Sequence, residues 1–296
     1  NIYQYTYNDD YAEGLTPISL WSVNEDRPEK SGKHRVRMKN FRSHNANISL
    51  KKAIYQEFDG TGSQKGFVND LLEDYDRPEL SKEDVLLDCT EYRIAIREIA
   101  NSTNERTLVA SVIPKGAITV HTLSTIRPYE VNPTEDDLSE YPMHTAYERV
   151  FTDRELFAAL GILNSIPFDY LMRTKVNTHI VKYKFEESQM PRLTEGDDWF
   201  NYIAERAAKL NCYGDAFEEM RERLNEIKPA TTAEERHRLQ AEIDAAALHA
   251  YGLNRRDVQF ILDDFYRVSD PRLMTEEYFD MVFEKFDLLE QEGPHP

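Results

Sequence analysis

The sequence predicts an α+β fold in which a mixed, mostly antiparallel β module precedes a helical module. Residues 92–97 alternate apolar with charged side chains, which is typical of a half-buried strand. Residues 108–113 form an apolar run that is typical of a fully buried strand. From residue 197 onward the apolar residues recur at helical spacing. We therefore expect one module over residues 1–193 and a second over residues 194–296.

The chain before this strand pair predicts short elements. Residues 1–29 indicate irregular structure with one or two strands. Residues 33–39 alternate cationic and apolar side chains, which predicts a strand with a cationic face. Such a face either contacts phosphates or is a solvated edge strand protected by its charge. Residues 48–58 and 67–75 predict short helices, the second ending before a proline.

After the pair, residues 115–123 predict a strand entered through a glycine turn, and residues 127–145 predict a long surface loop. A short strand is expected over residues 145–150. Thr152 and Glu155 form a capping-box pattern, which predicts the start of a helix over residues 153–163. The remaining expected elements of this half are a short helix over 168–173 and a strand over 174–185.

Five helices are expected in the second half. Thr232, Asn254 and Thr275 are residue types that cap helix N-termini, and each precedes a helical pattern. The tight connection at residues 228–231 predicts that the helices on either side of it are antiparallel neighbours. The expected helices span residues 199–210, 213–227, 233–251, 255–266 and 276–290.

A polar loop, residues 101–107, lies between the two central strands. Arg97 and Arg106 can each form bidentate hydrogen bonds with a guanine edge or a phosphate. Asn101 and Asn104 can form such bonds with an adenine edge. The alternative is that these arginines join neighbouring glutamates in an internal salt-bridge network. Both interpretations are compatible with the sequence.

A second polar segment, residues 173–179, combines two cations with threonine, asparagine and histidine. Arg173 and Lys175 are suited to contact a nucleic-acid backbone, and Asn177 and Thr178 are suited to lie near base edges. The alternative is a solvated turn.

The charge distribution is uneven. The net charge is −18, although nucleic-acid-binding proteins usually carry a basic footprint. Residues 30–52, however, contain eight Lys or Arg and no acidic residue. The general acidity also fits a high-salt habitat, where net charge maintains solubility.

Three segments resemble a known family: Tyr92–Pro114, with its Thr-Asn-Glu-Arg-Thr-Leu core, then Leu163–Val176 and Glu242–Leu253. Together they are similar to the C-terminal target-recognition region of large adenine-specific DNA methyltransferases of restriction–modification and phage-defence systems, of the type IIG kind. The resemblance covers roughly residues 85–270. It implies a DNA target-recognition module, a helical spacer module, double-stranded DNA as partner, and an upstream methyltransferase domain that uses S-adenosylmethionine.

Catalytic motifs are missing from the sequence. It has no Pro-Pro pair for the loop that holds a flipped adenine, and no Pro-Asp pair typical of metal-dependent restriction nucleases. The glycine-rich segment 58–66 lacks the strand and the acidic residue of an S-adenosylmethionine site. Cys89, Cys212 and the histidines show no metal spacing. We therefore expect no catalysis, no metal and no cofactor in this chain itself.

The chain begins at Asn1, and we interpret the chain as an excised part of a longer protein. No apolar run approaches the ~18 residues of a membrane span, so we expect no membrane contact. Cys89 and Cys212 are far apart and are typical of idle thiols in a reducing cytosol, so we expect a cytoplasmic protein. Two other functions remain open: a docking module that binds a defence complex through its acidic helices, and a hydrolase with unrecognised carboxylate chemistry.

The DNA hypothesis requires a concave cationic surface built from distant segments and wide enough for a duplex. The residues expected to contact DNA are Lys33, Arg35, Arg37, Lys39, Arg42, Arg97, Asn101, Asn104, Arg106, Arg173, Lys175, Asn177 and Thr178.

Reversing the charge of Arg35, Arg37 and Lys39 together should weaken binding to all duplexes alike, because phosphate contacts carry no sequence information. Fluorescence anisotropy with several unrelated duplexes measures this effect. Unchanged affinity would assign these residues to edge protection.

Overall fold

The computed structural model describes residues 47–77, 79–81, 83–119, 122–265 and 271–295. The cationic strand expected over residues 33–39, with Lys33, Arg35, Arg37 and Lys39, lies outside the described residues, as does Arg42. The described part contains eleven α-helices and a small antiparallel sheet region, so the α+β class is confirmed. Helix accounts for 52% and strand for 8%, so the β component is smaller than the sequence suggested.

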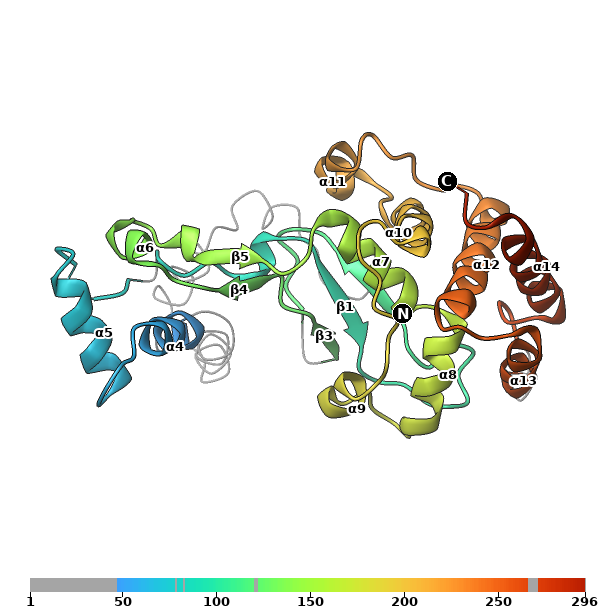
Figure 1. Cartoon of the computed structure of the whole chain (residues 1–296), viewed down its shortest axis with the longest axis horizontal. Helices are drawn as coiled ribbons and strands as arrows, with labels where there is room; N and C mark the ends of the chain where they lie inside the picture. The colour runs from blue at the N-terminus through green and yellow to red at the C-terminus, as the bar shows by residue number, and fades with distance from the viewer. Residues whose placement is uncertain (1–46, 78, 82, 120–121, 266–270, 296) are drawn as a thin grey trace, which may run out of the picture.

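The described residues form two lobes, each with its own hydrophobic core (Figure 1). The small lobe packs around residues such as Leu50, Leu72 and Leu138. The large lobe has a core that runs from Tyr92 to Leu289. This core crosses the expected boundary at residue 193, because α10 (Asp198–Asn211) and α12 (Ala233–Ala250) of the second half pack on α7 (Asp153–Leu163) of the first. The structure therefore groups the chain differently from the modules 1–193 and 194–296.

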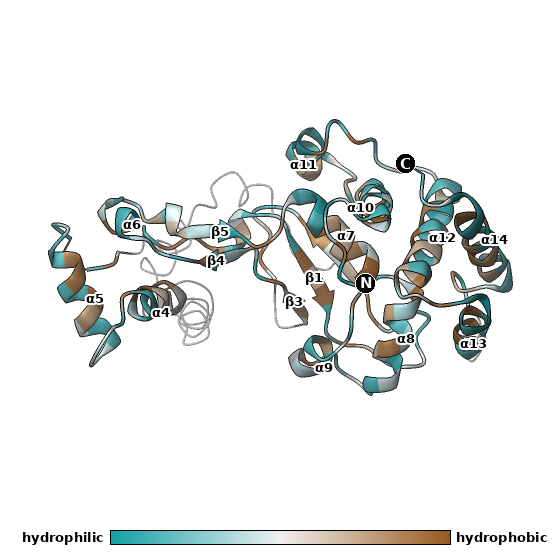
Figure 2. Ribbon diagram, in the orientation of Figure 1, coloured by the Kyte–Doolittle hydropathy of each residue, from teal (hydrophilic) through white to brown (hydrophobic). Residues whose placement is uncertain are grey.

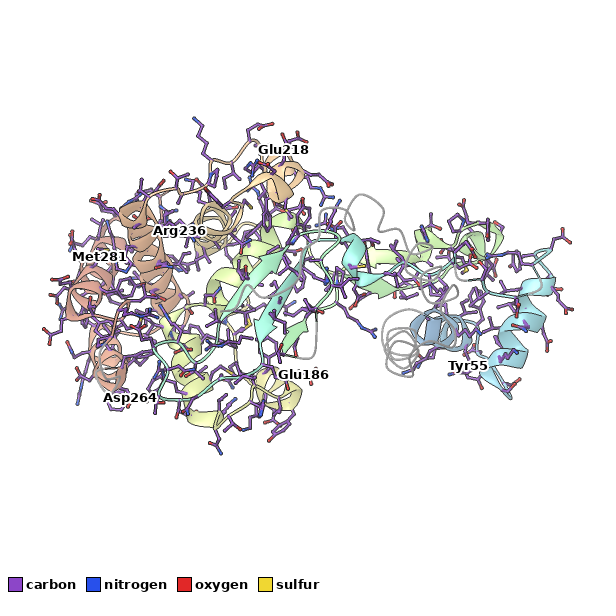
Figure 3. All side chains as sticks on the ribbon, turned by 180° about the vertical axis from the view of Figure 1, so that it is seen from behind. Tyr55, Glu186, Glu218, Arg236, Asp264 and Met281 are labelled. Atoms are coloured by element: carbon purple, nitrogen blue, oxygen red, sulfur yellow. The ribbon has the colours of Figure 1, made fainter. Side chains whose placement is uncertain are left out.

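The small lobe contains α4 (Asn47–Glu57), α5 (Gln64–Glu73), α6 (Glu135–Ser139) and a hairpin of β4 (Tyr129–Val131) and β5 (Tyr147–Arg149). Both expected helices and the strand near residue 147 are confirmed. The loop expected over residues 127–145 is wrong in part, since it contains β4 and α6. A capping box of Thr134 and Asp137 starts α6, and burial of Leu138 holds it. Figure 3 shows Tyr55 in this lobe and Met281 at the opposite end of the molecule.

The sheet of the large lobe has the order β2–β1–β3, with both pairs antiparallel. Its strands are β1 (Arg93–Arg97), β2 (Ala110–Ile113) and β3 (Leu123–Thr125). The two central strands are confirmed. The strand expected over residues 115–123 is wrong for its described part, because pairing with β1 begins at Leu123 and Gly116 is in a turn with φ 79°.

The outer edge of β2 is paired with side chains. Asn164, the C-cap of α7, accepts the N–H of Ala110 at 2.9 Å and donates to its carbonyl at 3.0 Å. Asn211, at the end of α10, makes the same two bonds with Val112 at 3.0 and 3.1 Å. A carboxamide repeats the donor and acceptor of a peptide group, so these two side chains close the edge as another strand would.

Within the described residues the large lobe has eight α-helices, and Figure 2 shows hydrophobic residues concentrated on β1 and α7 at the centre of the lobe. The capping box of Thr152 and Glu155 is confirmed, and Thr232 and Thr275 also accept backbone N–H groups as N-caps. The helices are α7 (Asp153–Leu163), α8 (Ile166–Lys175), α9 (Lys182–Glu186), α10 (Asp198–Asn211), α11 (Glu218–Arg223), α12 (Ala233–Ala250), α13 (Arg255–Phe265) and α14 (Glu276–Glu292).

Two expectations about elements of the large lobe are wrong. The strand over residues 174–185 is reduced to a single bridge between Ile99 and His179, and the segment then turns into α9. The helices before and after residues 228–231, α11 and α12, are not the antiparallel neighbours that the sequence predicted. Instead, α12 packs mainly on α10 and α14.

Replacing Asn211 by Leu should lower the free energy of unfolding by about 1–3 kcal/mol, because two main-chain groups of Val112 lose their partners. Urea titration measures this change. Asn211→Asp should also destabilise, since a carboxylate cannot donate to the Val112 carbonyl. The control is Asn201→Ala, an exposed position on the same helix, with an expected loss under about 0.5 kcal/mol. Equal losses for Asn211→Leu and Asn201→Ala would contradict the role of the amide.

Candidate nucleic-acid interface

Arg173 fixes the polar loop between β1 and β2 through hydrogen bonds to the loop backbone. This side chain is buried and donates to the carbonyl oxygens of Ser102 at 2.8 Å and of Asn104 and Glu105 at 2.6 Å each. Its Nε donates to Asp169 Oδ2 at 3.1 Å. All three of its nitrogens are therefore used inside the protein. The expectation that Arg173 contacts DNA is wrong, because the side chain positions the loop instead.

Arg106 is bound in a second internal network. Its Nη2 donates to Asp244 Oδ2 at 2.7 Å, and Tyr278 donates to the same oxygen at 2.5 Å. The other carboxylate oxygen, Oδ1, accepts the N–H of Ile166 at 2.7 Å. Burial beside Asp244 raises the pKa of Tyr278 well above its ordinary value, so its hydroxyl stays a donor. Arg106 thus ties the loop to α8, α12 and α14, which corrects its expected role as a base reader.

Arg97 and Lys175 also point to internal partners. Nη2 of Arg97 donates to the carbonyl oxygens of Arg106 at 3.0 Å and Thr107 at 3.3 Å. Nζ of Lys175 donates to the carbonyl of Glu187 and the hydroxyl of Ser188, each at 3.1 Å. The concave cationic surface that these residues were expected to share with Arg106 and Arg173 is therefore not formed by them.

Glu105 anchors the loop to the segment before α14. Its Oε1 accepts the backbone N–H groups of Arg272 at 2.5 Å, Leu273 at 2.7 Å and Met274 at 3.3 Å. Burial alone would raise the pKa of Glu105, but these three hydrogen bonds bring it below its ordinary value. The carboxylate is therefore charged at neutral pH and fixed in place.

The two predicted polar segments lie side by side. The N–H of Ala100 donates to the carbonyl of Thr178 at 3.1 Å, and the N–H of Ile180 donates to the carbonyl of Glu98 at 2.8 Å. An antiparallel bridge links Ile99 and His179 between them. The structure thus joins loops that are far apart in the sequence into one surface.

This surface presents neutral hydrogen-bonding groups, and we call it the loop-pair surface. Asn101, Asn177 and Thr178 are exposed, as expected for base-contacting residues. Within the described residues, neither Asn177 nor Thr178 makes a side-chain hydrogen bond. Asn104 is half-buried and turns away toward a cleft. Exposed neighbours from the same two polar segments, which were not among the residues expected to contact DNA, are Ser102, Thr103 and His179.

A cleft of about 930 Å³ opens on the other side of the same loop. It is lined by β2, α7, α10, α12 and residues 272–274. Its two lining carboxylates are Glu105 and Asp244, and both are already hydrogen-bonded within the protein. The converging, unpartnered acids that a carboxylate hydrolase requires are therefore not found among its lining residues.

No protein-family model matches this chain, and no curated protein or solved structure is significantly similar to it. Among the helices of the described residues, none has the length and apolar character needed to span a membrane.

Replacing Arg173 by Met should lower the free energy of unfolding by about 3–5 kcal/mol, because buried Asp169 loses its charge partner and three carbonyls lose their donor. Chemical denaturation measures this loss. Arg192→Met removes an exposed arginine and should change stability by less than about 0.5 kcal/mol. If both substitutions have a small effect, Arg173 does not stabilise the loop and is available to contact a ligand.

Proposed function

We propose that this chain is the DNA sequence-recognition part of an adenine-specific DNA methyltransferase of a restriction–modification or phage-defence system. The methyltransferase domain, with S-adenosylmethionine, would lie upstream and modify an adenine in double-stranded DNA in the cytoplasm. The family resemblance of three segments supports this proposal. The observation that carries it is the bridge between Ile99 and His179, which brings Asn101 and Asn177 onto one surface.

The loop-pair surface has the chemistry of base recognition. Amide and hydroxyl side chains can both donate and accept, which is how base edges in a groove are distinguished. Arg173, Arg106 and Glu105 fix the backbone of the polar loop. A ligand that binds the exposed side chains of this loop therefore causes little further loss of conformational entropy. A fixed loop that presents neutral hydrogen-bonding side chains favours discrimination between DNA sequences over general affinity for DNA.

Phosphate contacts must then come from other residues. Arg97, Arg106 and Arg173 are bonded internally, so the basic stretch over residues 30–52, most of which lies outside the described residues, is our candidate for backbone contact. The whole chain carries a net charge of −18, so the residues outside this basic stretch should repel a duplex at low salt. We expect a modest dependence of affinity on salt. A slope near zero would favour the alternative docking module, which binds protein through its acidic helices.

Replacing Asn177 or Asn101 by Ala should change the preferred base at one or two positions of the target, since a bidentate amide contact contributes about 1–3 kcal/mol of discrimination. Selection from a random duplex library, followed by anisotropy with the selected sites, measures this preference. The free energy of unfolding should stay unchanged for Asn177→Ala, because this side chain is exposed and makes no hydrogen bond among the described residues. Asn101→Ala should lower it by about 0.5–1.5 kcal/mol, because Oδ1 of Asn101 accepts the N–H of Thr103 at 3.1 Å.

Asn201→Ala is the matched control, because this exposed asparagine lies on α10 away from the loop-pair surface. It should leave sequence preference unaltered. If Asn101→Ala and Asn177→Ala also select the same site as the original protein, the loop-pair surface does not recognise bases. If the chain binds no duplex at any salt concentration, the proposed function is wrong.

A further inference from the structure

The cleft beside the polar loop is a separate concave site from the loop-pair surface. Its volume of about 930 Å³ falls within the range of small-molecule pockets, roughly 300–1,000 Å³. Its walls are the strand β2 and the helices α7, α10 and α12, which are all part of the large core. A site with such walls is largely formed before a ligand arrives.

The cleft has an excess of cationic groups in an acidic protein. Its lining includes two carboxylates, Glu105 and Asp244, against four arginines, Arg97, Arg106, Arg236 and Arg272. Figure 3 shows Arg236 near α10 and α12, where its Nη1 donates to the carbonyl of Leu210. Such an excess favours an anionic ligand.

Two buried guanidinium nitrogens of this lining lack partners among the described residues. Nη1 of Arg106 and Nε of Arg97 are buried and make no hydrogen bond within the described structure. A buried donor without a partner costs about 1–3 kcal/mol, so these nitrogens favour occupancy by an acceptor. Arg272 is exposed, and its guanidinium makes no hydrogen bond among the described residues.

The neutral groups of the cleft suit a heterocyclic base. The carboxamides of Asn104 and Gln240 line it and form no side-chain hydrogen bond in the described part of the chain. A carboxamide can pair with the edge of a base through one donor and one acceptor. Tyr213 and Leu273 also line the cleft with 65% and 49% of their area exposed, and an exposed ring is a surface on which a base stacks.

We propose that this cleft binds a nucleoside phosphate, with the arginines contacting the phosphate and Asn104, Gln240 and Tyr213 contacting the base. The ligand is either a free nucleotide or a nucleotide within a single strand. This inference does not depend on the proposed duplex recognition, because different residues carry it.

Calorimetric titration of the 296-residue chain tests the proposal. The probes are the 5′-monophosphates of adenosine, guanosine, cytidine and thymidine, inorganic phosphate, and a single-stranded pentanucleotide. At least one nucleotide probe should bind about tenfold or more tightly than inorganic phosphate. Binding of the monophosphates identifies a free nucleotide as the ligand, and binding of the pentanucleotide alone identifies a nucleotide within a strand.

Arg272→Ala and Gln240→Leu should each weaken nucleotide binding about tenfold or more, while a circular dichroism melt shows the fold intact. Arg192→Ala and Gln56→Leu are matched controls at exposed positions that do not line the cleft, and they should leave affinity unchanged. The proposal is overturned if no nucleotide probe binds, if inorganic phosphate binds as tightly, or if all four variants behave alike. Each of these results leaves the duplex-binding test untouched.

Discussion

The large lobe depends on two buried guanidinium–carboxylate pairs beneath one polar loop. Arg106 with Asp244 and Arg173 with Asp169 connect the loop to α8 and α12. Each carboxylate also accepts a backbone N–H, from Ile166 and Leu108 respectively. Removing one partner of such a pair leaves an uncompensated charge in the core, which costs several kcal/mol. The pairs therefore fix one position of the loop relative to the helices.

This constraint divides the polar side chains by role. The cationic ones turn inward, where carbonyl and carboxylate oxygens accept hydrogen bonds from most of their nitrogens, and the neutral ones around Asn101 and Asn177 face solvent. The cationic surface that the DNA hypothesis required is not formed by the described arginines of this loop, so recognition at this place would depend on neutral amide and hydroxyl groups alone. The cost is weak general attraction to a duplex, which the basic segment over residues 30–52 would have to supply.

The edge of β2 and the neighbouring cleft follow from the same arrangement. Asn164 and Asn211 saturate the outward main-chain groups of the strand, so the helices can leave a cleft beside it without exposing unpaired peptide groups to a second strand. Arg106 belongs to both features, because Nη2 binds Asp244 and Nη1 has no partner. The loop thus has one face toward the loop-pair surface and the other toward the cleft.

Local sequence determined the elements whose signals are local. The helix over residues 153–163 was predictable from Thr152 and Glu155, whose reciprocal bonds span three positions, and β1 and β2 were predictable from side-chain alternation and apolar content. The segment 174–185 shows the opposite case. Its alternation suits a strand, but after the bridge at His179 the described part of the chain offers no neighbouring strand to pair with it, and it forms α9.

The candidate site was predictable only in part, for the same physical reason. Sequence identified both polar segments, and it left open whether the arginines are readers or scaffold. Only the tertiary structure decides this, because the partner of Arg106 lies 138 positions away and that of the loop carbonyls is on α8. An arginine has the same local pattern whether its guanidinium meets a buried carboxylate or solvent. Burial and long-range partners are properties of the folded chain, and they fixed which of these residues remain available to a ligand.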